Sequence, residues 1–177
     1  MDKDIKDLKV LIDNQKLISR IKELAHEINI AYGTSKPLTL ICVLRGAVMF
    51  FTELSKYLEM PVKMEFVSLS SYGDGQKSSG KIKTLNLNLP NMHEENVLIV
   101  EDIVDTGLTL DFLIKFIKMN CCAQDVKLAV LFDKKCARKY DVTPDFSAFE
   151  IDDKFIVGFG LDYTGLYRNL DYVGYFP

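Results

Sequence analysis

The stretch VLIVEDIVDTGLTL, residues 97–110, decides the fold of this chain. Its first four residues are all apolar, which is typical of a central parallel strand covered on both faces. Glu101 and Asp102 follow this strand, and the polar turn DTGLT at 105–109 opens a helix predicted over 108–119. A strand, a polar turn and a helix in this order predict one βα unit of an α/β sheet.

The segments on either side of this unit also alternate between strands and helices. Hydrophobic spacing predicts helices over 14–31, with Asp13 as the N-cap, and over 47–58. Short aliphatic runs predict further strands over 38–43, 62–69, 126–132 and 155–159. We therefore expect an α/β fold in which a mostly parallel, twisted sheet is flanked by helices. Ligands should gather at the carboxyl ends of its strands.

The composition is that of one globular domain. A chain of 177 residues, 48% hydrophobic and 27% charged, can bury a core. Its net charge of −3 does not attract nucleic acid, and it has neither an apolar run of bilayer length nor a signal peptide at its start. We therefore expect a soluble, cytoplasmic protein without nucleic-acid or membrane partners. Its four cysteines lack C-x-x-C spacing and are expected to be reduced thiols.

The turn at 105–109 is a candidate phosphate site. The first amides of a helix have no acceptor within the helix, and the positive end of the helix dipole lies there, so a phosphate monoester can bind. Thr106 and Thr109 add hydroxyl donors, and Gly107 permits close approach. Alone, the pattern D-T-G-x-T is a weak signal, because Asp and Thr before a helix are more often ordinary caps.

Glu101 and Asp102 favour the phosphate interpretation. Acids at the end of a fully apolar strand are costly to bury unless they meet a cation or hydroxyl donors. A carboxylate pair beside a phosphate site suits the cis-diol of a sugar and a Mg²⁺ held mainly by substrate oxygens. The residues thus predict a ribose 5-phosphate ligand with a metal.

The segment VEDIVDTGLTL, 100–110, closely resembles the phosphoribosyl pyrophosphate signature of type I phosphoribosyltransferases. Four further motifs follow the order of the hypoxanthine-guanine branch of that family: Leu44-Arg45-Gly46-Ala47, Ser71-Tyr72-Gly73, Lys134, and 155–158 with 161–163. The resemblance covers nearly the whole chain. It implies a single domain over 1–177, with a flexible lid at about 70–83 and a hood formed by the N-terminal segment and about 134–177.

The resemblance also implies an activity, a cofactor and an assembly. The family transfers the 5-phosphoribosyl group of phosphoribosyl pyrophosphate to a purine, in this branch hypoxanthine and guanine. The products are IMP or GMP and pyrophosphate. The family uses Mg²⁺ and commonly forms homo-oligomers, dimers or tetramers. Two alternatives stay open, namely a noncatalytic regulator that binds the donor, and an enzyme for xanthine or adenine.

Residue roles follow from the same resemblance. Asp105 is the expected catalytic residue, either taking the proton from N7 of the purine or accepting a hydrogen bond from it. The expected metal ligands are Glu101, Asp102 and Asp162. The expected substrate contacts are Leu44, Arg45, Gly46, Ser71, Tyr72, Glu101, Asp102, Ile103, Thr106, Gly107, Leu108, Thr109, Lys134, Phe155, Ile156 and Arg168.

Several of these contacts have a specific expected part. Lys134 donates to the 6-oxo group of the purine, with Lys135 as the alternative by one register. Phe155 stacks on the base and the backbone of Ile156 faces its Watson–Crick edge, unless both are merely core residues. Arg168 neutralises the pyrophosphate. The loop at 44–47 holds pyrophosphate with a cis peptide before its arginine, and the segment 70–83 is either a lid or a solvated loop.

Overall fold

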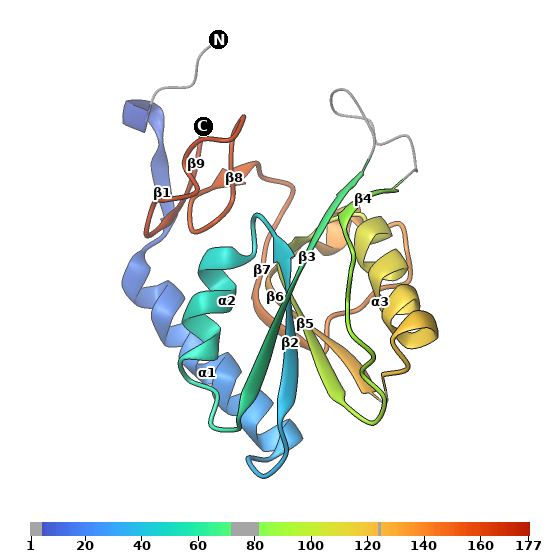
Figure 1. The fold of residues 1–177 in the computed structure, drawn as a ribbon. Coiled ribbons are helices and arrows are strands. Elements are labelled where there is room, and N and C mark those ends of the chain that lie inside the picture. The colour runs from blue at the N-terminus through green and yellow to red at the C-terminus, as the bar shows by residue number, and fades with distance from the viewer. Residues whose placement is uncertain (1–4, 72–81, 124) are drawn as a thin grey trace.

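A computed structural model describes residues 5–71, 82–123 and 125–177 (Figure 1). A six-stranded sheet has the order β4-β3-β2-β5-β6-β7, and all of its neighbours are parallel except β4 against β3. Its strands are β2 (Leu38–Leu44), β3 (Val62–Ser71), β4 (Ile82–Asn86), β5 (Asn96–Val104), β6 (Asp125–Asp133) and β7 (Phe146–Glu150). The five parallel strands confirm the expected α/β sheet.

Helices cover both faces of this sheet. On one face lie α1 (Asn14–Tyr32) and α2 (Val48–Ser55), and on the other lies α3 (Leu108–Asn120) (Figure 1). The two apolar layers meet the two faces of β5, so this strand is buried on both sides as its sequence predicts. Helix α1 begins after Asp13, whose carboxylate accepts a hydrogen bond from the Lys16 amide at 2.9 Å. The predicted N-cap is confirmed.

A second, small antiparallel sheet joins the two ends of the chain. Its order is β1-β9-β8, with β1 (Lys9–Ile12), β9 (Val173–Tyr175) and β8 (Ile156–Val157). It lies near the ends of the chain in Figure 1. Gly160, between β8 and β9, brings this small sheet, called the hood from here on, against the loop that follows β2, because a Cβ on it would lie 2.0 Å from the Gly46 carbonyl oxygen. Only a glycine allows that approach between backbones.

Several expected boundaries were wrong for local reasons. The helix expected over 47–58 is shorter, since the amides of Lys56 and Tyr57 bond three residues back and tighten its last turn. The strand expected over 155–159 ends at Val157, because Gly158 and Phe159 have positive φ. Sequence reasoning missed β1, β4, β7 and β9. Two short 3-10 turns, Ile5–Asp7 and Lys135–Ala137, complete the elements.

The expected lid falls mainly outside the described residues. Residues 72–81, including Tyr72, are not described, and 70–71 and 82–83 are backbone positions in β3 and β4. The four cysteines are free thiols, of which Cys42 and Cys121 are buried. Among the described parts of the chain, no helix has the length and apolarity that a membrane crossing needs.

Candidate active site

The carboxyl ends of β2, β5 and β6 bring the predicted site residues together. These three strands are neighbours in the sheet and all run parallel, so the segments that follow them lie at one edge. The Lys134 amide donates to the carbonyl oxygen of Val104 at 3.1 Å, which joins the start of the segment after β6 to the end of β5. The topology thus assembles three sequence motifs that are far apart along the chain.

The loop after β2 packs directly on Asp102. A Cβ on Gly46 would lie 1.7 Å from Asp102 Oδ2, so this position has no room for any side chain. The peptide bond between Leu44 and Arg45 is cis, as the resemblance implies. Arg45 is exposed, whereas Gly46 is buried. The loop therefore has an exposed arginine directly before the glycine that packs on the buried acid.

Glu101 and Asp102 lie within β5, not after it as expected, and are buried, with 9% and 8% of their surface exposed. The Asp102 amide donates to Glu101 Oε1 at 3.2 Å, and the Ile103 amide donates to Asp102 Oδ1 at 2.8 Å. Burial, followed by the negative charge of Asp102 and a hydrogen bond to it, raises the pKa of Glu101 well above its usual range. A cation or hydroxyl donors would therefore stabilise this buried pair of acids.

Cys42 belongs to the same environment. Burial, and then the charges of Glu101 and Asp102, raise the pKa of its thiol to about 12. The thiol is thus protonated at neutral pH and is a poor nucleophile. Its part is to fill the core below the acids.

The turn between β5 and α3 has a glycine at its centre. Gly107 is the N-cap of α3 with φ 88°, and no side chain caps the helix there. The Leu108 amide approaches Thr106 Oγ1 only at 3.5 Å, the outer limit of a hydrogen bond. The alternative of an ordinary Asp or Thr side-chain cap is therefore not what the structure contains. Thr109 lies in the first turn of α3 and is half-buried.

The carbonyl groups of this turn bind the segment after β6. The amides of Lys139 and Tyr140 both donate to the Thr106 oxygen at 3.0 Å, and Arg138 Nε donates to the Asp105 oxygen at 3.1 Å. In a trans peptide the N–H group points opposite to the C=O group. The amides of Thr106 and Gly107 are therefore directed away from this segment, as a phosphate site requires.

Arg138 is a site residue that sequence reasoning missed. Besides Asp105, its guanidinium donates to the Val142 carbonyl oxygen and to the buried carboxylate of Asp133. Its Cδ also lies 3.2 Å from where a Cβ of Gly107 would be. The arginine thus fixes the turn from behind. The buried aspartate at the end of β6 gave a weak signal for a nearby cation, but not for which one.

Lys134 lies where β6 ends, with only 14% of its side chain exposed, and its Nζ pairs with Asp153 Oδ1 at 2.6 Å. Burial alone would lower the pKa of Lys134, but the hydrogen bond that its ammonium donates to Asp153 and the charges of Asp105, Asp153 and Cys136 raise it overall. The ammonium is thus in the field of the expected catalytic acid. Lys135 is exposed and pairs with Glu150 at 2.6 Å, so the geometry favours Lys134 over this alternative.

The hood contributes the remaining predicted residues. Phe155 is 54% exposed and makes an edge-to-face contact with Tyr163, with 5.8 Å between ring centroids, so it is not a core residue. Ile156 is buried in β8. Arg168 donates to the Gly160 carbonyl oxygen at 2.6 Å and pairs with Asp162 at 2.5 Å. Its charge is therefore already matched by an acid in this structure.

Asp162 does not join the acid pair of β5. Its second carboxylate oxygen accepts a hydrogen bond from the Gly165 amide at 2.6 Å. Across the described residues, no three or more His, Cys, Asp or Glu side chains are grouped closely enough to hold a metal ion. The expected metal ligands thus form two separate places, one in β5 and one in the hood.

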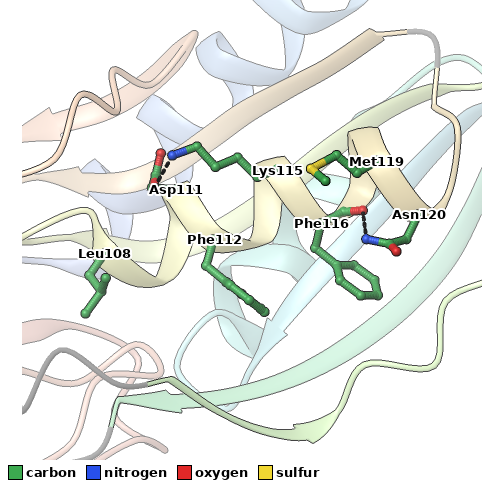
Figure 2. A pocket seen from close by; sticks show the side chains of 7 residues that line it. All are labelled: Leu108, Asp111, Phe112, Lys115, Phe116, Met119 and Asn120. Atoms are coloured by element: carbon green, nitrogen blue, oxygen red, sulfur yellow. Dashed lines mark hydrogen bonds and ion pairs between the residues drawn. The ribbon is translucent and has the colours of Figure 1, made fainter.

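A shallow groove of about 500 Å³ follows the outer side of α3 (Figure 2). Its apolar part is formed by Leu108, Phe112, Phe116 and Met119, and the two phenyl rings stack with centroids 6.3 Å apart. The Asp111–Lys115 ion pair borders it. Leu108 is the one predicted site residue in its lining, so the groove is a feature of the helix surface and is distinct from the cluster around Asp102.

Comparisons with known proteins agree with this arrangement. The phosphoribosyl transferase domain family matches residues 7–164. The hypoxanthine-guanine phosphoribosyltransferase of Streptococcus thermophilus is 42% identical over 174 residues, covering 98% of this chain and 94% of the relative. That of Bacillus subtilis is 40% identical over 166 residues, covering 94% and 91%. The chain belongs to the hypoxanthine-guanine phosphoribosyltransferases.

Solved structures support the same family assignment for this phosphoribosyltransferase. A crystal structure of a hypoxanthine phosphoribosyltransferase from Staphylococcus aureus superposes with a TM-score of 0.91 at 32% identity, covering 97% of this chain and 93% of that one. The predicted family and fold are thus confirmed, and so is the expectation of a purine salvage enzyme. These comparisons favour an enzyme over the noncatalytic, donor-binding regulator that was the alternative.

Proposed function

We propose that this enzyme joins the anomeric carbon of phosphoribosyl pyrophosphate to a nitrogen of hypoxanthine, and of guanine, through the residues gathered at the carboxyl edge of the sheet. The products are IMP or GMP and pyrophosphate. One observation carries the proposal: a buried acid pair lies just before a turn whose amides point outward because Arg138 and the amides of 139 and 140 bind its carbonyls. That is a site for a sugar with a 5-phosphate.

The ribose phosphate half of the donor binds at β5 and at the start of α3. The amides and hydroxyls of 106–109 hold the 5-phosphate, aided by the dipole of a 13-residue helix. Glu101 and Asp102 accept hydrogen bonds from the 2- and 3-hydroxyls. As pyrophosphate leaves, positive charge grows on the sugar ring, and the carboxylates stabilise it. Ile103 contributes through its backbone, which lies between the acid pair and the turn.

A Mg²⁺ ion fits the acid pair. The adjacent buried carboxylates of Glu101 and Asp102, which form no ion pair with any described residue, offer the oxygen ligands that Mg²⁺ prefers, while the substrate supplies others. When bound, the ion neutralises charge on the pyrophosphate leaving group. Asp162 would serve a second ion only after releasing Arg168. Arg45 and Arg168, with the amide of Gly46, then face the pyrophosphate.

The purine binds between the segment after β6 and the hood. The Lys134 ammonium donates to the 6-oxo group, and the exposed carboxylate of Asp105 receives the N7 proton or its hydrogen bond. Phe155 stacks on the base, and the backbone of Ile156 faces its Watson–Crick edge. Since xanthine and guanine differ from hypoxanthine only at C2, backbone geometry decides among them. Residues 1–177 act as one domain in which Ser71 and Tyr72 contact the donor from the lid.

A homo-oligomer, dimer or tetramer, is part of this proposal. Val48, Met49, Met64 and Phe66 are apolar and between 37% and 45% exposed on α2 and β3. The Phe66 ring lies 5.5 Å from that of Phe51, which joins the two elements into one surface. A paired Met64→Lys, Phe66→Lys variant should halve or quarter the mass measured by light scattering. A mass unchanged by this variant would place the interface elsewhere.

The test of the activity is pyrophosphate release with each of hypoxanthine, guanine, xanthine and adenine, with and without Mg²⁺. Release should occur with hypoxanthine and guanine and should need Mg²⁺. Release with none of the four would point instead to a donor-binding regulator. Asp105→Asn should retain substrate affinity and lose much of kcat, because the amide cannot take a proton. An unchanged kcat would remove Asp105 from the reaction.

A further inference from the structure

The ion pair between Lys134 and Asp153 is unusually asymmetric. The lysine side chain is 14% exposed, whereas the aspartate side chain is 84% exposed, and their charged atoms lie 2.6 Å apart. An exposed acid gains little from such a pair in stability. For the largely buried lysine the consequence is one of geometry, because the pair holds the end of a long, flexible stem in one place.

Asp153 is well placed for this part. It lies in the segment 151–155 that connects β7 to Phe155 and β8. Two hydrogen bonds shape this segment: the Ile151 amide donates to the Asp133 oxygen at 3.1 Å, and the Lys154 amide donates to the Asp152 oxygen at 2.7 Å. Asp153 thus pairs with Lys134 from the short segment that leads, two residues later, to the expected base-stacking ring of Phe155.

We propose that Asp153 is a positioning residue, which holds the Lys134 ammonium where it donates to the 6-oxo group and thereby sets the preference for 6-oxopurines. The inference rests on the proposed role of Lys134. An ammonium has three N–H donors and no acceptor. Asp153 takes one donor and fixes the direction of the others, which can bind an oxo group but not a 6-amino group. A site built to pair one polar group discriminates strongly against its replacement.

The charges around Lys134 make the ammonium a reliable donor. Asp153 from the 151–155 segment, Asp105 from the turn after β5 and Cys136 from the neighbouring 3-10 turn all act on it, against the effect of burial. Asp153 contributes both a hydrogen bond and a charge. Without it, burial is opposed only by the more weakly acting Asp105 and Cys136. The lysine would then lose its proton at a lower pH and would also be less well placed.

The decisive comparison is between Asp153→Asn and the matched control Asp152→Asn. Both remove one exposed carboxylate from the same segment, but Asp152 offers only its backbone oxygen to a described hydrogen bond. For Asp153→Asn we expect KM for hypoxanthine and guanine to rise about 2- to 5-fold, the size of a partly exposed ion pair. KM for the donor, kcat and Tm should be nearly unchanged. Asp152→Asn should match the wild type, and Asp153→Glu should recover most of the affinity.

A pH profile separates positioning from a general structural effect. Lys134 must be protonated to donate, so kcat/KM for hypoxanthine falls as pH rises through its pKa. In Asp153→Asn that alkaline fall should begin at a lower pH than in the wild type or in Asp152→Asn, measured in the same buffers. An unchanged profile together with an unchanged KM, or an equal change in Asp152→Asn, overturns the inference.

Lys134→Met distinguishes failure of the inference from failure of the assignment beneath it. A large rise in KM for hypoxanthine in Lys134→Met, with no effect of Asp153→Asn, would retain Lys134 at the base and reject Asp153. No rise in Lys134→Met would remove Lys134 from the purine site, and the role of Asp153 would fall with it. A rise in both, larger for the lysine, is the expected result.

Discussion

Gly46→Ala tests the contact between the loop after β2 and Asp102. The new Cβ would lie 1.7 Å from Asp102 Oδ2 and 2.5 Å from its Cγ, whereas ordinary contact begins at 3.4 Å. The carboxylate must therefore retreat by about 1.7 Å, and a misplacement of about 1 Å at a reacting group costs about 100-fold in rate. We expect kcat/KM for pyrophosphate release to fall by at least about 100-fold, or about 2.7 kcal/mol.

Two comparisons make this prediction strict. Gly33→Ala adds a methyl group where nothing lies within 4 Å, although its φ of 68° adds strain. It should cost about 1 to 2 kcal/mol of stability and no activity. In an Asp102→Ala background the clashing atoms are gone, so Gly46→Ala should lower Tm much less than in the wild type. An equal Tm loss in both backgrounds, or full activity of Gly46→Ala, would refute the reasoning.

Three further predictions concern groups behind the site. Arg138→Met should lower the free energy of unfolding in urea by about 3 kcal/mol, because it leaves Asp133 buried without its cation, and should raise KM for the donor by loosening the turn at 105–107. Because the pKa of Glu101 is raised, stability is highest below the ordinary carboxyl pKa and is lost as pH rises, so Glu101→Gln should raise Tm above neutral pH but not below about pH 4 in ligand-free thermal scans. Iodoacetamide at about pH 8 should label Cys122 and Cys136 but spare buried Cys42 and Cys121, as peptide mass spectrometry would show; early labelling of Cys42 would contradict its burial.

The parts of the fold that sequence could predict are those with strong local patterns. The all-apolar run 97–100 indicated a central strand, and the spacing over 14–31 indicated an amphipathic helix with an Asp13 cap. Strands β1 and β9 of the small sheet could not be found in this way, although the run 155–159 indicated β8. Its strands have two to four residues, and β1 pairs with a strand some 160 positions later, so neither has a periodic signal of its own.

The same distinction, between local patterns and contacts formed on folding, applies to the candidate site. The sequence pattern indicates Glu101, Asp102 and the turn at 105–109, because polar residues that follow an apolar run need an explanation. Arg138 and Asp153 do not, because their importance arises from which atoms the folded chain brings near them. On the sequence alone each is one charged residue among many. Contacts formed over long chain separations are the information that a linear pattern lacks.

The position of β9 in the small sheet has a consequence for biosynthesis. This strand, at Val173–Tyr175, is the central one of three, and both β1 and β8 hydrogen-bond to it. The ribosome therefore completes the phosphate half of the site long before the strand that organises the purine half is available. A nascent chain can acquire its donor cradle early, but the aromatic wall for the base must wait until β9 has left the exit tunnel.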